Sequence, residues 1–198
     1  TDAICYDGTY DHSERTWARE NGFTSREFTV TLEAAQQLID AGIPFVLHTV
    51  EVGSGHSQAV VGYDLLRESL FIQDPGEPHY REVNTDEFLQ NYRLNGPRGL
   101  VLVPAEQEDR LASFTLPDAE PYEHYHRLNK ALSVYQRDEA QAALDELERL
   151  APQHRLTLLA HVTMASFDGN EVARLHAIER LLEVYPDDPR LLHWHYNA

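Results

Sequence analysis

Alternating apolar and polar residues dominate the first half of the chain, whereas helical periodicity dominates the second half. The alternation predicts strands at residues 23–30, 44–52, 56–63, 69–73 and 99–103. Apolar residues at helical spacing predict short helices at residues 11–20, 31–41 and 84–92. Short connections between strands favour hairpins, so we expect a mostly antiparallel sheet in an α+β domain over residues 1–104.

The predicted helices carry recognisable start and stop signals. Asp11-His12-Ser13-Glu14 has the form of a capping box, in which Asp11 caps the helix and Glu14 reaches back. Asn84-Thr85-Asp86-Glu87 has a similar form. Gly42 stands where a helix favours a left-handed residue after its last turn, and Pro44 blocks continuation.

The second half contains an internal repeat. Pro152 and Pro186 are 34 residues apart, and so are Leu147 and Leu181. We expect one helix pair at 122–136 with 138–151, and a second at 155–167 with 171–185. A helix–turn–helix unit of about 34 residues resembles the tetratricopeptide repeat, which implies an all-α repeat domain over residues 122–198. The proline-rich and acidic segment 105–121 is expected to be a linker.

The repeat pattern also suggests where the sequence is cut. Asp187-Asp188-Pro189 opens a third helix pair, and the sequence ends inside its first helix. Because each repeat buries its apolar face on the next one, we expect the chain to be a piece of a longer protein.

Composition and charge exclude several classes of function. The 198 residues contain 33 Asp and Glu against 16 Lys and Arg, giving a formal charge of −17. Nucleic acid is not an expected partner, because binding phosphates requires a basic surface. No run of 18 apolar residues predicts a membrane span. A single cysteine, Cys5, excludes an internal disulfide framework. No location is fixed by the sequence, and a cytoplasmic one is favoured. The charge favours basic or neutral peptides as ligands.

One histidine and one aspartate stand out by their placement. His56 begins one predicted strand, and Asp74 follows the next strand, 18 residues later in the sequence. In an antiparallel hairpin these two ends lie side by side. The carboxylate then fixes one imidazole nitrogen, and the other nitrogen can take a proton from a nucleophile. The two residues would form the base and its orienting partner in a catalytic triad.

The sequence around this pair resembles a known family. The pattern GHSQAVVGYD followed by FIQDP is similar to that of C39-type, papain-like cysteine peptidase domains. Residues 31–46 and the closing strand at 99–104 resemble the same family, so that the resemblance covers roughly residues 1–104. It implies a papain-like fold in which His56 is the catalytic histidine and Asp74 is its orienting aspartate.

The cysteine departs from the family pattern. The family places its nucleophile at the start of a helix, after a glutamine, whereas Cys5 precedes a turn at Tyr6-Asp7-Gly8. Cys5 also lies only 51 residues before His56. We therefore expect either that the catalytic cysteine lies upstream of Thr1, or that this branch of the family has lost the cysteine. Cys5 is then a weak candidate nucleophile, or an inert buried residue.

Other candidates give weaker signals. Gln58 should face the same side of the strand as His56, where it lines a cleft or bonds to a strand neighbour. His124 with His126, and His193 with His195, have spacings that do not place two ligands on one helix face, so no metal or cofactor is predicted.

Three functions compete on these residues. The first is a cysteine peptidase module that acts on peptides, with the repeats as an interaction scaffold for a protein partner. The second is a non-catalytic scaffold that binds peptides or proteins. The third is a purely structural scaffold in which His56 and Asp74 are a remnant.

Overall fold

The computed structural model describes residues 11–51, 54–94 and 96–197, which divide into two compact units. The first unit runs to Ala119, except that Glu51 at the end of β2 groups with the second unit, which otherwise begins at Glu120. The first unit contains the elements α1 (Asp11–Glu20), β1 (Phe23–Thr29), α2 (Leu32–Asp40), β2 (Phe45–Glu51), β3 (Ser54–Asp64), β4 (Ser69–Gln73), β5 (Arg81–Asn84), α3 (Thr85–Gln90), β6 (Arg98–Pro104), a 3₁₀ helix (Ala105–Gln107) and α4 (Glu108–Ala112).

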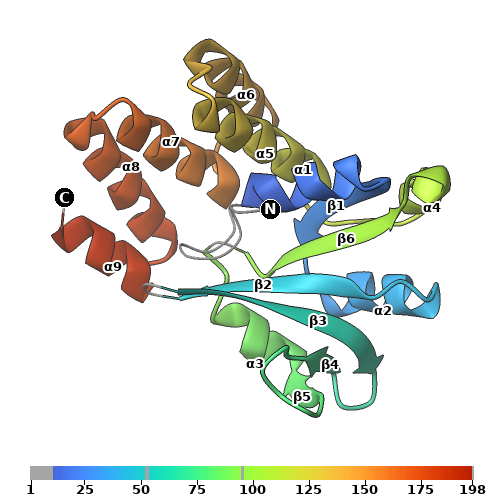
Figure 1. The fold of residues 1–198 in the computed structure, drawn as a ribbon. Coiled ribbons are helices and arrows are strands. Elements are labelled where there is room, and N and C mark those ends of the chain that lie inside the picture. The colour runs from blue at the N-terminus through green and yellow to red at the C-terminus, as the bar shows by residue number, and fades with distance from the viewer. Residues whose placement is uncertain (1–10, 52–53, 95, 198) are drawn as a thin grey trace. The chain divides into compact units, whose positions relative to one another are not determined.

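The strands of the first unit form one antiparallel sheet of six strands in the order β1-β6-β2-β3-β4-β5. Helix α1 lies on one face of this sheet, and α2 and α3 lie on the other face (Figure 1). The expected α+β class and the mostly antiparallel sheet are therefore confirmed.

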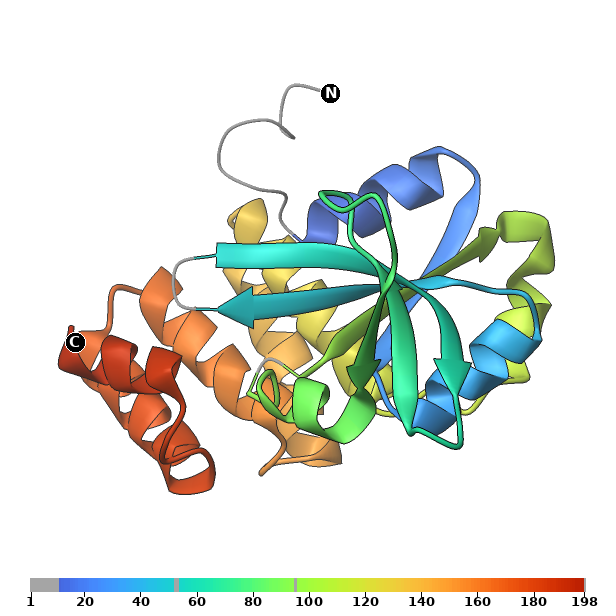
Figure 2. The same ribbon diagram turned by 90° about the horizontal axis from the view of Figure 1, so that it is seen from below.

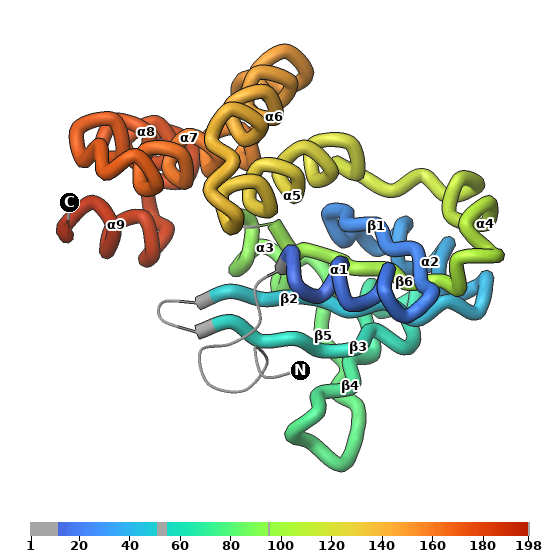
Figure 3. Tube along the Cα trace, turned by 45° about the horizontal axis from the view of Figure 1, so that its top comes forward, coloured from blue at the N-terminus to red at the C-terminus, as the bar shows by residue number. Residues whose placement is uncertain are grey.

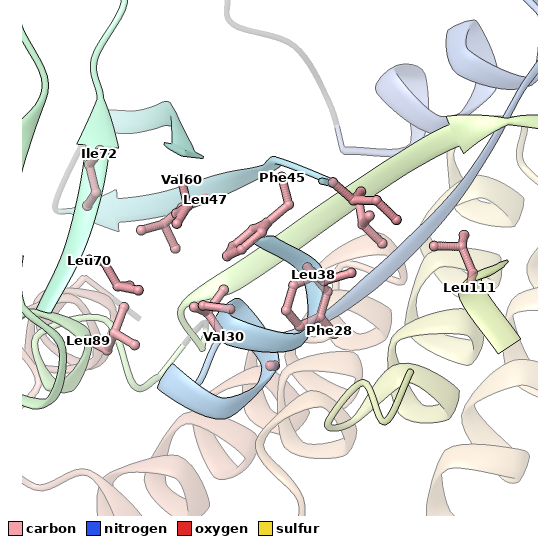
Figure 4. Packing of buried hydrophobic residues seen from close by; sticks show 14 of the residues in the cluster. Phe28, Val30, Leu38, Phe45, Leu47, Val60, Leu70, Ile72, Leu89 and Leu111 are labelled. Carbon is pink, nitrogen blue, oxygen red and sulfur yellow. The ribbon is translucent and has the colours of Figure 1, made fainter. Parts of the chain in front are cut away.

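The core lies between the sheet and α2. Phe28 of β1 and Phe45 of β2 meet edge to face with ring centroids 5.3 Å apart, and Leu38 of α2 is fully buried beside them (Figure 4). Leu47 and Val60 extend the same cluster along β2 and β3. Because side chains alternate along a strand, the neighbours of these residues point to the face that carries α1.

Local signals explain where the short helices begin and end. The Thr31 hydroxyl accepts a hydrogen bond from the backbone N–H of Ala34 at 3.1 Å, which caps α2. Gly42 follows that helix with φ of +74°, as expected from its position. Asn84 caps α3 by accepting from the N–H of Glu87 at 3.1 Å. The side chain of Asp11 lies outside the described residues.

Strand β5 was not predicted from the sequence. Its four residues, Arg81–Asn84, include one apolar side chain, Val83, so no alternating run is long enough to reveal a strand. The strand exists because it pairs with β4, where Leu70 lies opposite Val83 and Ile72 lies opposite Arg81. Hydrogen bonds and side-chain contacts with β4 therefore stabilise a strand that the local sequence does not favour strongly.

The segment after β6, expected to be a linker over residues 105–121, has structure of its own. It contains the 3₁₀ helix and α4, and Leu111 joins the core of the first unit (Figure 4). The Arg110 guanidinium donates to the carbonyl of Ala41 at 2.8 Å, and the N–H of Thr29 donates to the carbonyl of Pro117 at 2.8 Å. Most of the segment thus packs on the first unit.

From Glu120 onward the second unit consists of helices joined by short turns (Figure 3). Its helices are α5 (Ala119–Ser133, with its first residue in the first unit), α6 (Arg137–Leu150), α7 (Arg155–Phe167), α8 (Glu171–Val184) and α9 (Pro189–Tyr196). Helix α8 begins and ends 34 residues after α6. Buried residues recur at the same offset, with Leu147 matched by Leu181. Asp188 caps α9, accepting from the N–H groups of Arg190 and Leu191.

Candidate functional site

The hairpin of β3 and β4 brings His56 and Asp74 together. The antiparallel register pairs Ala59 with Gln73, so the start of β3 lies beside the end of β4 (Figure 2). The Nε2 atom of His56 lies 2.6 Å from Oδ2 of Asp74. The neighbouring ends expected from the sequence are therefore present in the structure.

Backbone and side-chain groups hold the Asp74 carboxylate in place. Its Oδ1 atom accepts a hydrogen bond from the N–H of Gly76 at 2.8 Å, which leaves Oδ2 directed at His56. The Gln73 amide donates to the carbonyls of Asp74 at 3.1 Å and of Glu77 at 3.0 Å. These hydrogen bonds hold the turn after β4 in one conformation. The Asp74 carboxylate is therefore preorganised to orient the His56 ring.

The electrostatics of the pair favour an ionised carboxylate. The hydrogen bond from His56 lowers the pKa of Asp74, and the N–H of Gly76 and the charge of Arg81 act in the same direction. The His56 side chain is 51% exposed, whereas that of Asp74 is 14% exposed. The aspartate is therefore the sheltered member of the pair, and the imidazole is the accessible one.

Gln58 lies two residues beyond His56 on the same side of β3. Its side chain is buried, and its Oε1 atom accepts a hydrogen bond from the Arg81 guanidinium at 3.0 Å. Of the two roles considered for this residue, the contact with another strand of the sheet is the one present. This hydrogen bond spans β4, because Gln58 lies on β3 and Arg81 on β5. It holds the Arg81 guanidinium where its charge acts on Asp74.

Three supporting residues, Gln73, Gly76 and Arg81, were not identified from the sequence. A turn signal was available for Gly76, because the Asp-Pro-Gly order at residues 74–76 is typical of a tight turn. The contribution of Arg81 depends on β5, which had no signal of its own.

The geometry of the pair defines what it can do chemically. The carboxylate contacts Nε2, so the proton belongs on that nitrogen, and the Nδ1 lone pair is left to accept a proton. Such a ring can act as a general base toward a thiol or a hydroxyl group. Cys5, the weak candidate nucleophile, lies outside the residues that the structure describes.

Among the residues that the structure describes, no three His, Cys, Asp or Glu side chains are grouped so that they could hold a metal ion. His193 and His195 lie on α9, where His195 approaches Glu179 at 3.7 Å and His193 contacts Asn197. None of the described helices has the length and hydropathy needed to cross a bilayer.

The first part of the chain is similar to a known protein family. Residues 2–99 match the model of the Peptidase_C39 like family, a range that includes both His56 and Asp74. No curated protein matches the sequence. The match covers the six-stranded sheet up to the beginning of β6. This match supports a C39-like domain in the first part of the chain, a peptidase-like module at the level of the family.

Proposed function

We propose that the C39-like domain engages peptides at His56 and Asp74, which act as base and orienting partner of a cysteine peptidase-type site. The contact of 2.6 Å between His56 Nε2 and Asp74 Oδ2 carries this proposal. The family match over residues 2–99 supports it, because it covers both residues.

The pair would serve a thiol in the following way. His56 takes the thiol proton on Nδ1, and the thiolate attacks the peptide carbonyl carbon. Asp74 keeps the ring oriented and stabilises the imidazolium that forms. The imidazolium then donates its proton to the leaving amine, and water hydrolyses the thioester. The nucleophile would be Cys5 or a cysteine outside these 198 residues.

For the 198 residues themselves, we propose peptide binding without cleavage as the principal activity. The sequence around Cys5 favours this form of the proposal, because the residues after the thiol predict a turn and not a helix. A helix N-terminus lowers the pKa of a cysteine and makes it reactive, and Cys5 lacks that setting in the sequence. The formal charge of −17 favours neutral or basic peptides as ligands.

We further propose that the helices after Ala119 are tetratricopeptide-like repeats that recruit a protein partner. The offset of 34 residues between α6 and α8 supports this, as do the matching burial positions. Ala143 and Leu144 are buried in α6, and Ala177 and Ile178 are buried at the same offset in α8. Stacked helix pairs of this kind present extended surfaces for binding.

A probe experiment separates cleavage from binding. The full chain is incubated with an epoxysuccinyl peptide, which alkylates the thiol of a cysteine peptidase, and adducts are measured by mass spectrometry. Neutral and basic peptides are titrated in parallel by calorimetry. We expect peptide binding without an adduct, and a loss of affinity of about tenfold or more in His56→Ala, equivalent to about 1.4 kcal/mol.

His79→Ala provides the matched control, because His79 is an exposed histidine on the loop after β4. This variant should bind peptides as the wild type does. An adduct on Cys5 that disappears in His56→Ala would assign the peptidase reaction to the chain. Absence of both peptide binding and the adduct would refute the proposed function.

A further inference from the structure

A row of polar and charged side chains crosses the face of the sheet that carries α1. The row alternates with the core residues along each strand, so it lies on the face opposite Phe28 and Leu47. Each of five elements contributes to it: α1, β1, β6, β2 and β3. Its members are Glu14, Arg15, Glu27, Arg98, His48 and Ser57.

Ion pairs fix one end of this row. Arg98 contacts Glu27 at 2.9 Å and Glu14 at 3.1 Å, and Arg15 contacts Glu27 at 2.9 Å. The side chains of Arg15 and Arg98 are each 9% exposed, so these pairs are screened little by solvent. The carboxylate of Glu14 is therefore held in one position over the sheet.

A histidine and a serine occupy the other end. The Nδ1 atom of His48 lies 2.8 Å from Oγ of Ser57, and its Nε2 atom lies 3.2 Å from Oε2 of Glu14. The second contact has the length of an ion pair but not the alignment of a hydrogen bond. Catalytic hydrogen bonds are often long or poorly aligned before substrate binds, and tighten afterwards.

These contacts set the direction of proton transfer. The charged Glu14 oxygen beside the buried Nε2 of His48 attracts an N–H group and repels a lone pair, so we place the proton on that nitrogen, facing Glu14. Nδ1 is then an acceptor, and the Ser57 hydroxyl donates to it. Ser57 is exposed, whereas His48 is buried. An accessible hydroxyl that donates to a sheltered, carboxylate-oriented imidazole has the arrangement of a serine nucleophile.

We propose that Ser57, His48 and Glu14 form a second site, in which Ser57 is an activated nucleophile that hydrolyses small uncharged acyl esters. Ser57 and His48 are its catalytic residues, and Glu14 is the positioning residue. This site is independent of the function proposed above, because His56 and Ser57 are consecutive on β3 and point to opposite faces of the sheet.

The reaction has two balanced steps. In the first, Ser57 Oγ bonds to the ester carbonyl carbon, its proton passes to His48 Nδ1, and the alkoxide leaves with that proton as an alcohol. In the second, water attacks the acyl carbon, gives its proton to His48, and the Ser57 oxygen takes the proton back. The net change is ester and water to carboxylic acid and alcohol.

The surroundings indicate the class of substrate. Val50 is 36% exposed, and it follows His48 by two residues on the same side of β2. Ala59 follows Ser57 in the same way on β3 and is half-buried. These side chains offer apolar contacts to an acyl chain. The two arginines of the row are engaged by Glu14 and Glu27, and the net charge of −17 disfavours anionic acyl groups.

A serine-directed probe tests the site. The full chain is treated with an alkyl fluorophosphonate, and the modified residue is located by peptide mapping. Hydrolysis of p-nitrophenyl butyrate is measured in parallel. We expect one adduct, on Ser57, and loss of both adduct and hydrolysis in Ser57→Ala. His48→Gln should lower the labelling rate by about 10²-fold or more, as expected when a general base is removed.

Two further variants complete the test. Ser133→Ala is the matched control, because the Ser133 hydroxyl donates to the carbonyl of Lys130 in its own helix at 2.7 Å. The Ser133→Ala variant should be labelled on Ser57 to the same extent as the wild type. Glu14→Gln should lower kcat per folded molecule at least tenfold and leave KM within twofold, with the folded fraction of each variant measured by circular dichroism so that a loss of folded protein is not counted as a loss of kcat. No adduct on wild-type Ser57, or unchanged hydrolysis in Ser57→Ala, would overturn the proposal.

Discussion

His48 and His56 lie on neighbouring strands of the sheet, β2 and β3, yet they differ in exposure and in the origin of their partners. His56 is about half exposed and contacts Asp74, which the hairpin of β3 and β4 delivers. His48 is 9% exposed and lies in a row of ion pairs drawn from α1, β1 and β6. An exposed pair can thus form within one hairpin, whereas a buried polar row depends on the whole sheet.

Arg98 should produce the largest effect on stability. In Arg98→Met, Glu27 and Glu14 each lose a partner on the face of the sheet that carries α1, where the Arg98 side chain is buried. Removing one member of a buried ion pair costs about 3–5 kcal/mol, and we expect a fall of that size in the free energy of unfolding measured with urea. Arg149→Ala, which breaks an exposed pair with Glu146, should cost about 0.5 kcal/mol or less. Equal effects of the two variants would contradict the contrast.

Gln73 should have an intermediate effect. In Gln73→Met the two hydrogen bonds to the carbonyls of Asp74 and Glu77 are lost, while the length of the side chain is kept. Each such bond contributes about 0.5–1.5 kcal/mol, so a total cost of about 1–2 kcal/mol is expected because the turn is partly exposed. Urea unfolding measures this cost. A change below about 0.5 kcal/mol would show that the turn is held by Gly76 and Pro75 alone.

Asp74→Asn should separate function from stability. The contact with His56 is accessible to solvent, so breaking it should leave the urea midpoint almost unchanged. Peptide affinity should fall as it does in His56→Ala, because the ring loses its orienting charge. A strong loss of stability in Asp74→Asn would mean that the pair has mainly a structural role, and the distinction between the two histidines would disappear.

The smallest effect concerns the titration of Asp74. Its pKa is lowered by His56, so the pair contributes stability above the unfolded-state value, which is about 3.9 for an aspartate. That contribution is lost as the pH falls through the lower, folded-state value. Carboxyl NMR should report a midpoint below the ordinary value, which moves upward in His56→Ala. Asp168, whose pKa is lowered by Arg137, should titrate identically in both proteins.

The parts of the molecule that could be predicted are those with a local cause. His56 and Asp74 are joined by a short hairpin, so their proximity follows from two strands and one turn. The ends of α7 at Arg155 and Phe167 follow from apolar periodicity, and the cap at Asn84 follows from its side chain. In each case the energy that fixes the element lies within a few residues of it.

The parts that could not be predicted depend on residues far apart in the chain. Glu14 was expected to reach back to its own helix, yet its carboxylate contacts Arg98 and His48 on two strands. A carboxylate that can be paired with a buried arginine gains more there than at an exposed helix end. No spacing in the sequence reveals this choice, because strand order decides it. Strand β5 and the packing of Leu111 have the same kind of cause.

The position of the bulge in β3 has a genetic consequence. The register of β3 against β4 shifts between Val60 and Gly62, beyond the part of the strand that carries His56 and Ser57. Because consecutive side chains alternate, inserting a single codon between Ser57 and the bulge would turn Ser57 to the face of Asp74 and His56 to the face of His48. Losing a single codon there would instead be absorbed by closing the bulge, where β3 has one extra residue. Single-codon insertions in this stretch would therefore exchange the chemistry of the two faces, whereas insertions in the turn at residues 65–68 would spare it.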